Sequence, residues 1–351
     1  MAKEEELPLG KDFKIFYKVK IGKGAFGEIF KGQNIQKGNN VAIKCENCKN
    51  IHKSLLKNEI NILYYLQGGI GIPKIYDYFL STKHNFMIVE MLGPNLEKIF
   101  YLCNKKFSQP TILSLGLQML NRIEFIHSRQ FIHGDIKPEN FLIGRNQNKN
   151  TVYLCDYGLS KRFRNKSNGM HIPYKDKIKF TGTPSYASIY THLEIERSRR
   201  DDLESLAYIL IYFFKGKLPW SKMKTKNKSR KFSKIFDLKM NTRIEDLCSD
   251  LPIEMQHFLQ YTRDLHFEQK PDYDYLRKLI NDMNKNGPNL TNLQFDFINI
   301  LEKKYKENKN KLLLENKIKN DKNANSNHSH ITTKSNTLEK NSINNKNEKD
   351  K

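Results

Sequence analysis

The segment at residues 133–140, His-Gly-Asp-Ile-Lys-Pro-Glu-Asn, constrains this chain more than any other part of its sequence. It places a carboxylate (Asp135), an ammonium group (Lys137) and an amide (Asn140) in one short loop. A second carboxylate, Asp156, begins an Asp-Tyr-Gly sequence directly after an apolar run. Carboxylate and amide oxygens are ligands that Mg²⁺ prefers, often together with phosphate groups, and a carboxylate can also accept a hydroxyl proton. The pattern therefore predicts phosphate chemistry on this loop.

A glycine-rich turn occupies residues 22–27, Gly-Lys-Gly-Ala-Phe-Gly, between two predicted strands. Glycines allow backbone N–H groups to approach phosphate oxygens closely. Dinucleotide-binding folds use the same glycine spacing, but there the turn opens a helix, whereas a strand follows here. The flanking strands therefore favour a hairpin that covers phosphate groups, with Ile29 over the base of a nucleotide.

The strand Val41-Ala42-Ile43-Lys44 follows this turn and ends in a lysine. Such a lysine supplies a point charge for the α- and β-phosphates and needs a carboxylate to hold it. Residues 52–66 have helical spacing of apolar side chains, and Glu59 lies on that segment. We therefore expect Glu59 to pair with Lys44.

Together these four motifs resemble those of the protein kinases in their order, spacing and elements. The resemblance implies an α+β, bilobal protein-kinase fold, with a small β-rich N-lobe and a larger helical C-lobe, and it implies ATP and Mg²⁺ as cofactors. Catalytic roles fall on Lys44, Glu59, Asp135 and Lys137, and metal ligation falls on Asn140 and Asp156. The expected ATP-binding residues are Ile21, Gly22, Lys23, Gly24, Ala25, Phe26, Gly27, Ile29, Ala42, Lys44, Glu90, Leu92 and Leu142.

Hydrophobic periodicity and composition predict where these parts begin and end. We expect an N-terminal extension at 1–12, a kinase domain at 13–300 and a Lys/Asn-rich tail at 301–351. The tail has few apolar residues and cannot bury enough surface to offset its ordering entropy, so disorder is expected there. Within the domain we expect an N-lobe at 13–89, a hinge at 90–93 and a C-lobe at 94–300.

A more specific resemblance, over residues 13–297, is to casein kinase 1. It is carried by eight segments: GGIGIP (68–73), EMLGPNLE (90–97), HIPY (171–174), KFTGT (179–183), YASIYTH (186–192), ERSRRDDLESL (196–206), LPW (218–220) and KPDYDYLR (270–277). The resemblance implies transfer to Ser or Thr, with a preference for acidic or already phosphorylated protein substrates. It also implies that Asp202 holds the backbone of residues 133–140, which correspond to the catalytic loop of the family.

The chain departs from that family at two arginine positions, which here are Gly134 and Ser185. His-Gly-Asp with Asp-Tyr-Gly is similar to the vaccinia-related kinases, the sister branch. A loop arginine normally needs an anion to neutralise it, so Gly134 predicts an enzyme that activation-loop phosphorylation does not switch. The arginines also contribute to the family's anion pockets, so Lys161 and Lys231 are the remaining candidates for a substrate anion site. Lysine lacks the bidentate fork of arginine, which leaves the need for a priming phosphate open.

The chain has a formal net charge of +23, which favours acidic partners, although a proteome rich in Lys and Asn codons would give the same excess. Residues 222–234 are densely basic, and a substrate cradle, a nuclear-import patch and a solvated loop all remain open. No apolar run is long enough to span a membrane and the five cysteines show no disulfide or zinc framework. We expect a monomer in the cytoplasm, with a nuclear pool as an open alternative.

Two other functions are weighed against an active enzyme. A weakly active or pseudokinase scaffold is disfavoured because every motif residue is present. A basic nucleic-acid-associated protein is disfavoured because no recognised binding motif occurs and no aromatic residues alternate with the basic tail residues.

Overall fold

The computed structural model describes residues 6–23, 27–47, 54–81, 83–221, 228–307 and 310. Two compact units are distinguished, Met1–Asp296 and Phe297–Lys351. In the second unit, residues 298–307 form a helix, so residues 301–307 of the predicted tail are helical. That stretch, Leu-Glu-Lys-Lys-Tyr-Lys-Glu, is rich in strong helix formers. The rest of the predicted disordered tail, apart from residue 310, lies outside the described residues.

The N-terminal part of the first unit is an antiparallel sheet in the order β1-β2-β3-β4-β6-β5. Its strands are β1 (Glu6–Leu9), β2 (Phe13–Lys23), β3 (Glu28–Asn34), β4 (Asn40–Asn47), β5 (Ile75–Phe79) and β6 (His84–Glu90). β1 belongs to the predicted extension, yet it pairs with the start of β2, with Leu9 opposite Phe13. Residues 6–9 therefore add an edge strand to the sheet.

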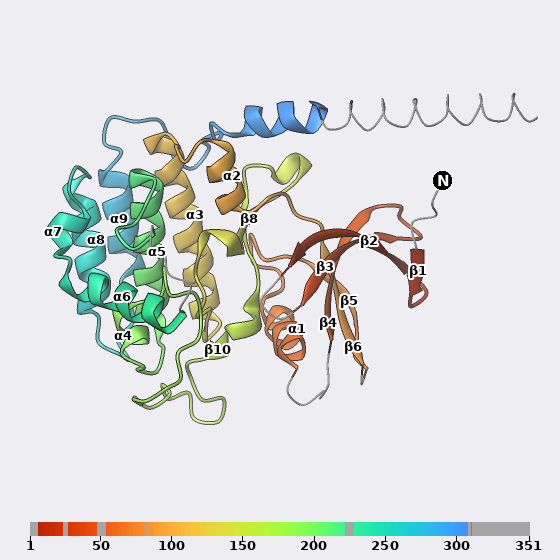
Figure 1. The fold of residues 1–351 in the computed structure, drawn as a ribbon, viewed down its shortest axis with the longest axis horizontal. Helices are drawn as coiled ribbons and strands as arrows, with labels where there is room; N and C mark the ends of the chain where they lie inside the picture. The colour runs from red at the N-terminus through yellow and green to blue at the C-terminus, as the bar shows by residue number, and fades with distance from the viewer. Residues whose placement is uncertain are drawn as a thin grey trace, which may run out of the picture. The chain divides into compact units, whose positions relative to one another are not determined.

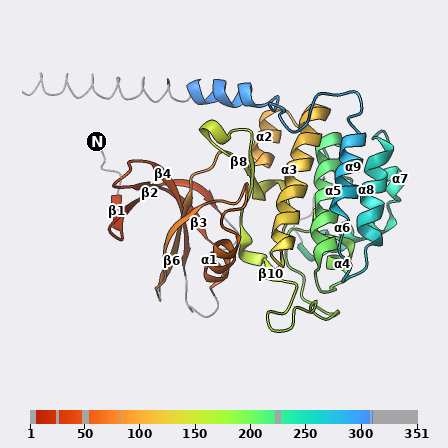
Figure 2. The same ribbon diagram turned by 180° about the vertical axis from the view of Figure 1, so that it is seen from behind.

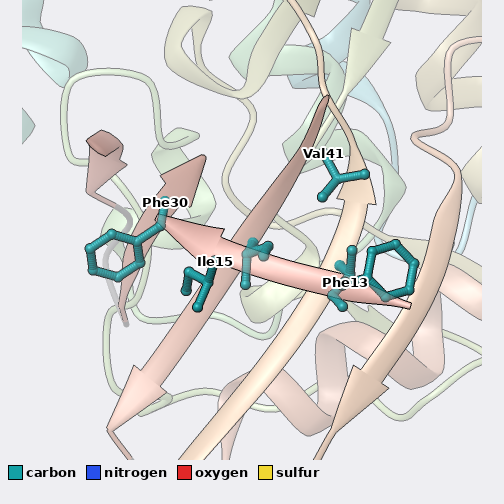
Figure 3. Close-up of a cluster of buried hydrophobic side chains, with 6 residues drawn as sticks. Phe13, Ile15, Phe30 and Val41 are labelled. Atoms are coloured by element: carbon teal, nitrogen blue, oxygen red, sulfur yellow. The ribbon is translucent and has the colours of Figure 1, made fainter. Parts of the chain in front are cut away.

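Alternating apolar residues build a core on one face of this sheet (Figure 3). The buried cluster comprises Phe13, Ile15, Phe30, Val41, Ile43 and Ile88. Along β2 the alternation of burial continues through half-buried Val19 and exposed Lys20 and ends at Ile21, where the pairing with β3, already shifted between Phe16 and Lys20, shifts register again before Gly22. Ile21 is consequently 38% exposed, at the end of β2 that leads into the glycine-rich turn.

Helix α1 (Leu55–Leu66) packs against the sheet and confirms the helix predicted from apolar spacing. Ser54 caps its N-terminus by accepting a hydrogen bond from the Lys57 amide. The buried face of α1 carries Leu56, Ile60 and Leu63 together with Glu59. One carboxylate is thus carried on an otherwise apolar helix face.

The C-terminal part of the first unit is mainly helical, as Figures 1 and 2 show from opposite sides. Its helices are α2 (Leu96–Leu102), α3 (Gln109–Ser128), α4 (Ile189–His192), α5 (Arg199–Lys215), α6 (Lys228–Asn241), α7 (Ile244–Leu247), α8 (Ile253–Asp264) and α9 (Tyr273–Asp282). Four short strands form two small antiparallel pairs, β7 (Phe131–Ile132) with β10 (Lys161–Arg162) and β8 (Phe141–Ile143) with β9 (Val152–Leu154). The separation of sheet and helices confirms the predicted α+β class.

Helix α5 is the centre of this helical part. Residues 199–213 of α5 are all buried, and α3 and α8 pack against it. A helix that is buried all round is typical of the interior of a large domain. The apolar run Tyr208–Phe214 therefore lies in a core helix, although Phe214 itself is only half-buried. Across the described residues, no helix is both long enough and apolar enough to cross a membrane.

The turn between α1 and β5 depends on glycine for its conformation. Gly71 has φ +71°, and its carbonyl accepts a hydrogen bond of 2.9 Å from the Leu154 amide at the end of β9. A Cβ atom there would lie 2.0 Å from Arg122 Nε and 2.3 Å from the Val152 carbonyl oxygen. Arg122 donates to that same carbonyl over 3.0 Å, so it cannot easily move aside.

Replacing Gly71 with Ala should therefore lower the free energy of unfolding by about 3 kcal/mol, because backbone strain and overpacking add. Gly68→Ala is the matched control: Gly68 has φ +86°, but nothing lies within 4 Å of its added Cβ. The control should lose only about 1 kcal/mol from the left-handed backbone. Urea unfolding of both variants tests this, and equal losses would show that the close contacts at Gly71 are unimportant.

Candidate active site

Lys44 on β4 is the point at which the sheet, α1 and the helical part meet. Its Nζ lies 2.6 Å from Glu59 Oε2 on α1 and 2.8 Å from Asp156 Oδ1 after β9. The lysine is 6% exposed, so one ammonium group is almost completely enclosed between two carboxylates. The structure therefore brings together three of the predicted site residues, and it brings Glu59 to Lys44 as expected.

The charges of Lys44, Glu59 and Asp156 shift the pKa values of one another. Burial alone would lower the pKa of Lys44, but the carboxylates of Glu59 and Asp156 outweigh it and raise that pKa above its usual value. Burial would raise the pKa of Asp156, but Lys44 outweighs it and holds this pKa below its usual value. Lys44 is therefore charged and Asp156 is ionised at neutral pH.

The position of α1 is fixed by a buried glutamate that sequence reasoning missed. Glu46 lies two residues beyond Lys44 on β4, is 8% exposed, and accepts a hydrogen bond of 3.0 Å from the Leu55 amide. It also accepts from the Ser54 hydroxyl and, over 3.2 Å, from the Asn85 side-chain amide on β6. An anionic group at a helix N-terminus is favourable, so Glu46 attaches the first turn of α1 to the sheet. Residues two apart in a strand lie on the same face, so the sequence already indicated that Glu46 lies on the same side of β4 as Lys44.

Asp156 owes its orientation to an unusual backbone and to the residue after it. It has φ +67°, in the left-handed region that non-glycine residues rarely adopt. The next residue, Tyr157, is 1% exposed, and its hydroxyl donates to the Leu154 carbonyl over 2.9 Å. Its ring packs at 5.4 Å from the ring of His133. Tyr157 therefore packs its ring against His133, and its hydroxyl has a hydrogen-bond partner inside the core.

The catalytic-loop residues form a second group of interacting side chains. Lys137 Nζ lies 2.6 Å from Asp135 Oδ2 and donates to Thr183 Oγ1 over 3.0 Å. Asn140 Nδ2 donates to the backbone carbonyl of Asp135 over 2.8 Å, which leaves its amide oxygen oriented away from that carbonyl. Asp135 and Asn140 are both buried. The loop therefore presents a carboxylate and a lysine together, beside a fixed amide.

Asp202 in the first turn of α5 holds this loop by hydrogen bonds to its backbone, as expected. Its carboxylate accepts hydrogen bonds from the backbone amides of His133 over 2.7 Å and Gly134 over 2.8 Å. His127 on α3 lies with Nε2 at 2.9 Å from the same carboxylate and with Nδ1 at 2.7 Å from the Tyr273 hydroxyl. Burial would raise the pKa of Asp202, but these hydrogen bonds outweigh it and lower the pKa. The anchor is thus an ionised, fully satisfied carboxylate.

The predicted nucleotide contacts lie on the elements around this site. Ala42 is buried on β4 and lies opposite Val89 on β6, and Leu142 is half-buried on β8. Gly27 lies close to β4, because an added Cβ would come within 2.2 Å of the Cys45 carbonyl oxygen. In the predicted hinge, the Gly93 amide donates to the Ile143 carbonyl over 2.8 Å, which joins this segment to β8.

The remaining nucleotide-site residues are placed as follows. Ile21, Gly22 and Lys23 end β2, Ile29 lies on β3, and Glu90 ends β6 just before Leu92. Gly24, Ala25 and Phe26 lie outside the described residues.

A segment next to the catalytic loop, residues 183–187, is held in place through its backbone carbonyls. Lys239 on α6 is 0% exposed and donates to the carbonyls of Pro184, over 2.9 Å, and Ala187. Trp220 Nε1 donates to the Ser185 carbonyl over 2.8 Å. Since Lys137 contacts Thr183, the 183–187 segment is held both from α6 and from the catalytic loop. Sequence reasoning missed Lys239, although it continues the apolar face of α6 that carries Ile235 and Phe236.

The predicted anion-site lysines have different surroundings. Lys161 on β10 forms an ion pair with Glu196, so its charge is already partly neutralised. Lys231 on α6 is exposed. Within the basic segment 222–234, Lys222 and Lys224 lie outside the described residues. The structure therefore does not bring Lys161 and Lys231 together through any contact between them in the described part of the chain.

Beside the 183–187 segment, His192 ends α4 in an aromatic environment. Its Nε2 lies 3.1 Å from the Pro184 carbonyl oxygen, and its ring stacks on Phe236. Burial, assisted by the charge of Lys239, lowers the pKa of His192 from 6.5 to about 4. The unfolded chain therefore takes up a proton first as the pH falls, and stability is lost between pH 6.5 and pH 4.

We expect this histidine alone to lower the free energy of unfolding by about 2 kcal/mol between pH 7 and pH 5. His192→Gln should remove that part of the pH dependence, whereas His257→Gln, at an exposed position on α8, should not. Urea unfolding at both pH values measures the difference. Identical pH dependence in the wild type and the His192→Gln variant would contradict a buried, neutral His192.

Comparison with known families agrees with this geometry. A family model described as the protein kinase domain matches residues 16–289, which is more than half of the chain. The match covers the glycine-rich turn, Lys44, the catalytic loop and Asp156, and it confirms the bilobal kinase fold expected from the sequence. The chain belongs to the protein kinase family.

Proposed function

We propose that this chain is a serine/threonine protein kinase of the casein-kinase-1 type, which transfers the γ-phosphoryl group of ATP with Mg²⁺. The observation that carries the proposal is the buried contact of Lys44 with both Glu59 and Asp156. A lysine held by a helix carboxylate, with a second carboxylate beside it, is the arrangement that phosphoryl transfer requires in kinases. Both carboxylates contact Lys44 in this structure, so no rearrangement of α1 is needed.

Mg²⁺ would be held by Asn140 and Asp156, and their chemistry fits it. Asp156 is ionised because Lys44 lowers its pKa, and carboxylate and amide oxygens are hard ligands that Mg²⁺ prefers. The Asn140 amide nitrogen is already used by the Asp135 carbonyl, so the amide oxygen is the end that remains for a cation. When bound, the metal neutralises charge on the β- and γ-phosphates.

The other site residues have roles in proton acceptance, charge neutralisation and nucleotide binding. Asp135 orients the substrate hydroxyl and accepts its proton, and Lys137, 2.6 Å away, neutralises charge on the transferring group. Lys44 holds the α- and β-phosphates as a point charge. We assign the adenine pocket to Ile21, Ile29, Ala42, Glu90, Leu92 and Leu142, with residues 22–27 covering the phosphates.

The proposed specificity for Ser/Thr and for acidic substrates rests on sequence and charge. Lys137 in the catalytic loop is a feature of Ser/Thr-type kinases, and the segments shared with casein kinase 1 extend from residue 68 to residue 277. The net charge of +23 and the exposed Lys231 favour acidic or phosphorylated protein substrates over neutral ones. We further propose a kinase domain at 13–300 and a monomer in the cytoplasm.

The direct test is transfer of labelled phosphate from ATP and Mg²⁺ to casein, followed by identification of the phosphorylated residue type. The full chain should label Ser and Thr and not Tyr. Asp135→Asn should lower kcat by about 10²- to 10⁴-fold, the usual contribution of a positioned proton acceptor. Asp156→Asn should also abolish most transfer, because it removes a charged metal ligand.

Asp246→Asn is the matched control, since Asp246 is an exposed carboxylate on α7 that pairs only with the exposed Arg243 in the described structure. This control should retain full activity. Transfer that is absent in the wild type despite ATP binding would contradict the proposal and favour a scaffold. Labelling of Tyr would leave a protein kinase but exclude the serine/threonine class.

A further inference from the structure

In the catalytic loop, the space that a side chain at Gly134 would occupy is filled by the side chain of Arg197. Gly134 has φ +77°, and a Cβ atom built on it would lie 2.3 Å from Arg197 Nη1 and 2.8 Å from Arg197 Cζ. Arg197 lies just before α5, far along the chain from the loop. Its guanidinium group therefore occupies the space directly beside the loop backbone.

Arg197 connects two segments that must be aligned for transfer. Its Nη1 donates to the Gly134 carbonyl, and its Nη2 donates to the Leu159 carbonyl over 3.3 Å. Gly134 immediately precedes Asp135, and Leu159 immediately follows the Asp-Tyr-Gly sequence that contains Asp156. One planar group thus joins the backbone beside the proton acceptor to the backbone beside the metal ligand.

Contacts of the neighbouring residues fix the position of Arg197. Its own backbone amide donates to Glu196 Oε1 over 3.0 Å, and Glu196 in turn pairs with Lys161 on β10. The next residue, Ser198, caps α5 through its amide and Asp201. Within the described residues, Arg197 forms no salt bridge, although its charge helps to lower the pKa of Glu196, and its Nη1 and Nη2 both donate to main-chain carbonyls. A lysine could not reproduce this, because it lacks the rigid fork of donors.

We propose that Arg197 is a positioning residue that aligns Asp135 with Asp156 by holding the Gly134 and Leu159 carbonyls. This inference rests on the proposed kinase function and deepens it. A loop arginine at position 134 would extend toward the activation segment and need an anion there, whereas Arg197 neutralises two carbonyl dipoles from within the fold. The alignment therefore does not require a phosphate on the activation segment.

The test compares Arg197→Met, which keeps an unbranched apolar stem but removes the guanidinium fork, with Arg197→Lys and with the exposed-surface control Arg243→Met. Arg197→Met should lower kcat by about 10- to 100-fold, as expected for a small misplacement of reacting groups. KM for ATP should change by less than about 2-fold, because the predicted ATP contacts lie on the sheet, the hinge and β8. Arg197→Lys should be intermediate, and Arg243→Met should match the wild type.

Two further measurements separate positioning from general stability. Methylguanidinium ions added to Arg197→Ala should restore part of kcat, whereas methylammonium ions should not. Hydrogen exchange of the amides at residues 133–137 and 157–161 should accelerate in Arg197→Met, while exchange in the middle of α5 stays unchanged. The exchange experiment needs no activity, so it decides the positioning claim even if the wild type transfers no phosphate and the proposed function fails.

Phosphatase treatment of the wild type tests the regulatory part of the inference. Treated and untreated enzyme should transfer phosphate at the same rate. Loss of activity on treatment, or unchanged kcat and unchanged hydrogen exchange in Arg197→Met, would overturn the proposal.

Discussion

The ammonium group of Lys44 between two carboxylates is the interaction on which the rest of the site depends. A buried charge is costly unless it is paired, so Lys44 in its 6% exposed position requires Glu59 and Asp156 to stay close. That requirement ties β4 to α1 and both to the segment after β9. Glu46 adds a second tie by fixing the N-terminus of α1 to the sheet. The proposed nucleotide site is therefore held together by charge pairing and helix capping within the fold.

In the helical part, residues at and just before the N-terminus of α5 hold the catalytic loop in position. Asp202 and Arg197 lie at the start of this buried helix and hold the catalytic loop by its backbone rather than by its side chains. Lys239 and Trp220 do the same for the 183–187 segment. Backbone anchoring of this kind fixes the segments that carry Asp135 and Thr183 without using their side chains, which instead contact Lys137. It also holds Gly134 through its backbone N–H and C=O groups, next to the proposed catalytic residue Asp135.

Sequence spacing predicted the parts of this structure that follow local rules. Apolar spacing located α1, the motif order predicted the kinase fold, and the Lys44–Glu59 contact followed from both. The contacts of Arg197 and Lys239 could not be predicted, because they depend on backbone carbonyls that are distant in sequence. The edge strand β1 was missed because Glu6–Leu9 is short and contains a proline, which suits an edge strand but gives a weak signal. The roles of individual ATP and metal contacts stay predictions.

Titration of ATP into the full chain with and without Mg²⁺, in the wild type and in Lys44→Met, tests the central claim most directly. If the Lys44, Glu59 and Asp156 cluster forms the triphosphate site, Mg²⁺ should strengthen ATP binding in the wild type. Lys44→Met should weaken ATP binding while leaving adenosine binding unchanged, because adenosine lacks the phosphates that Lys44 holds. Binding of ATP that is insensitive both to Mg²⁺ and to the loss of Lys44 would contradict the account.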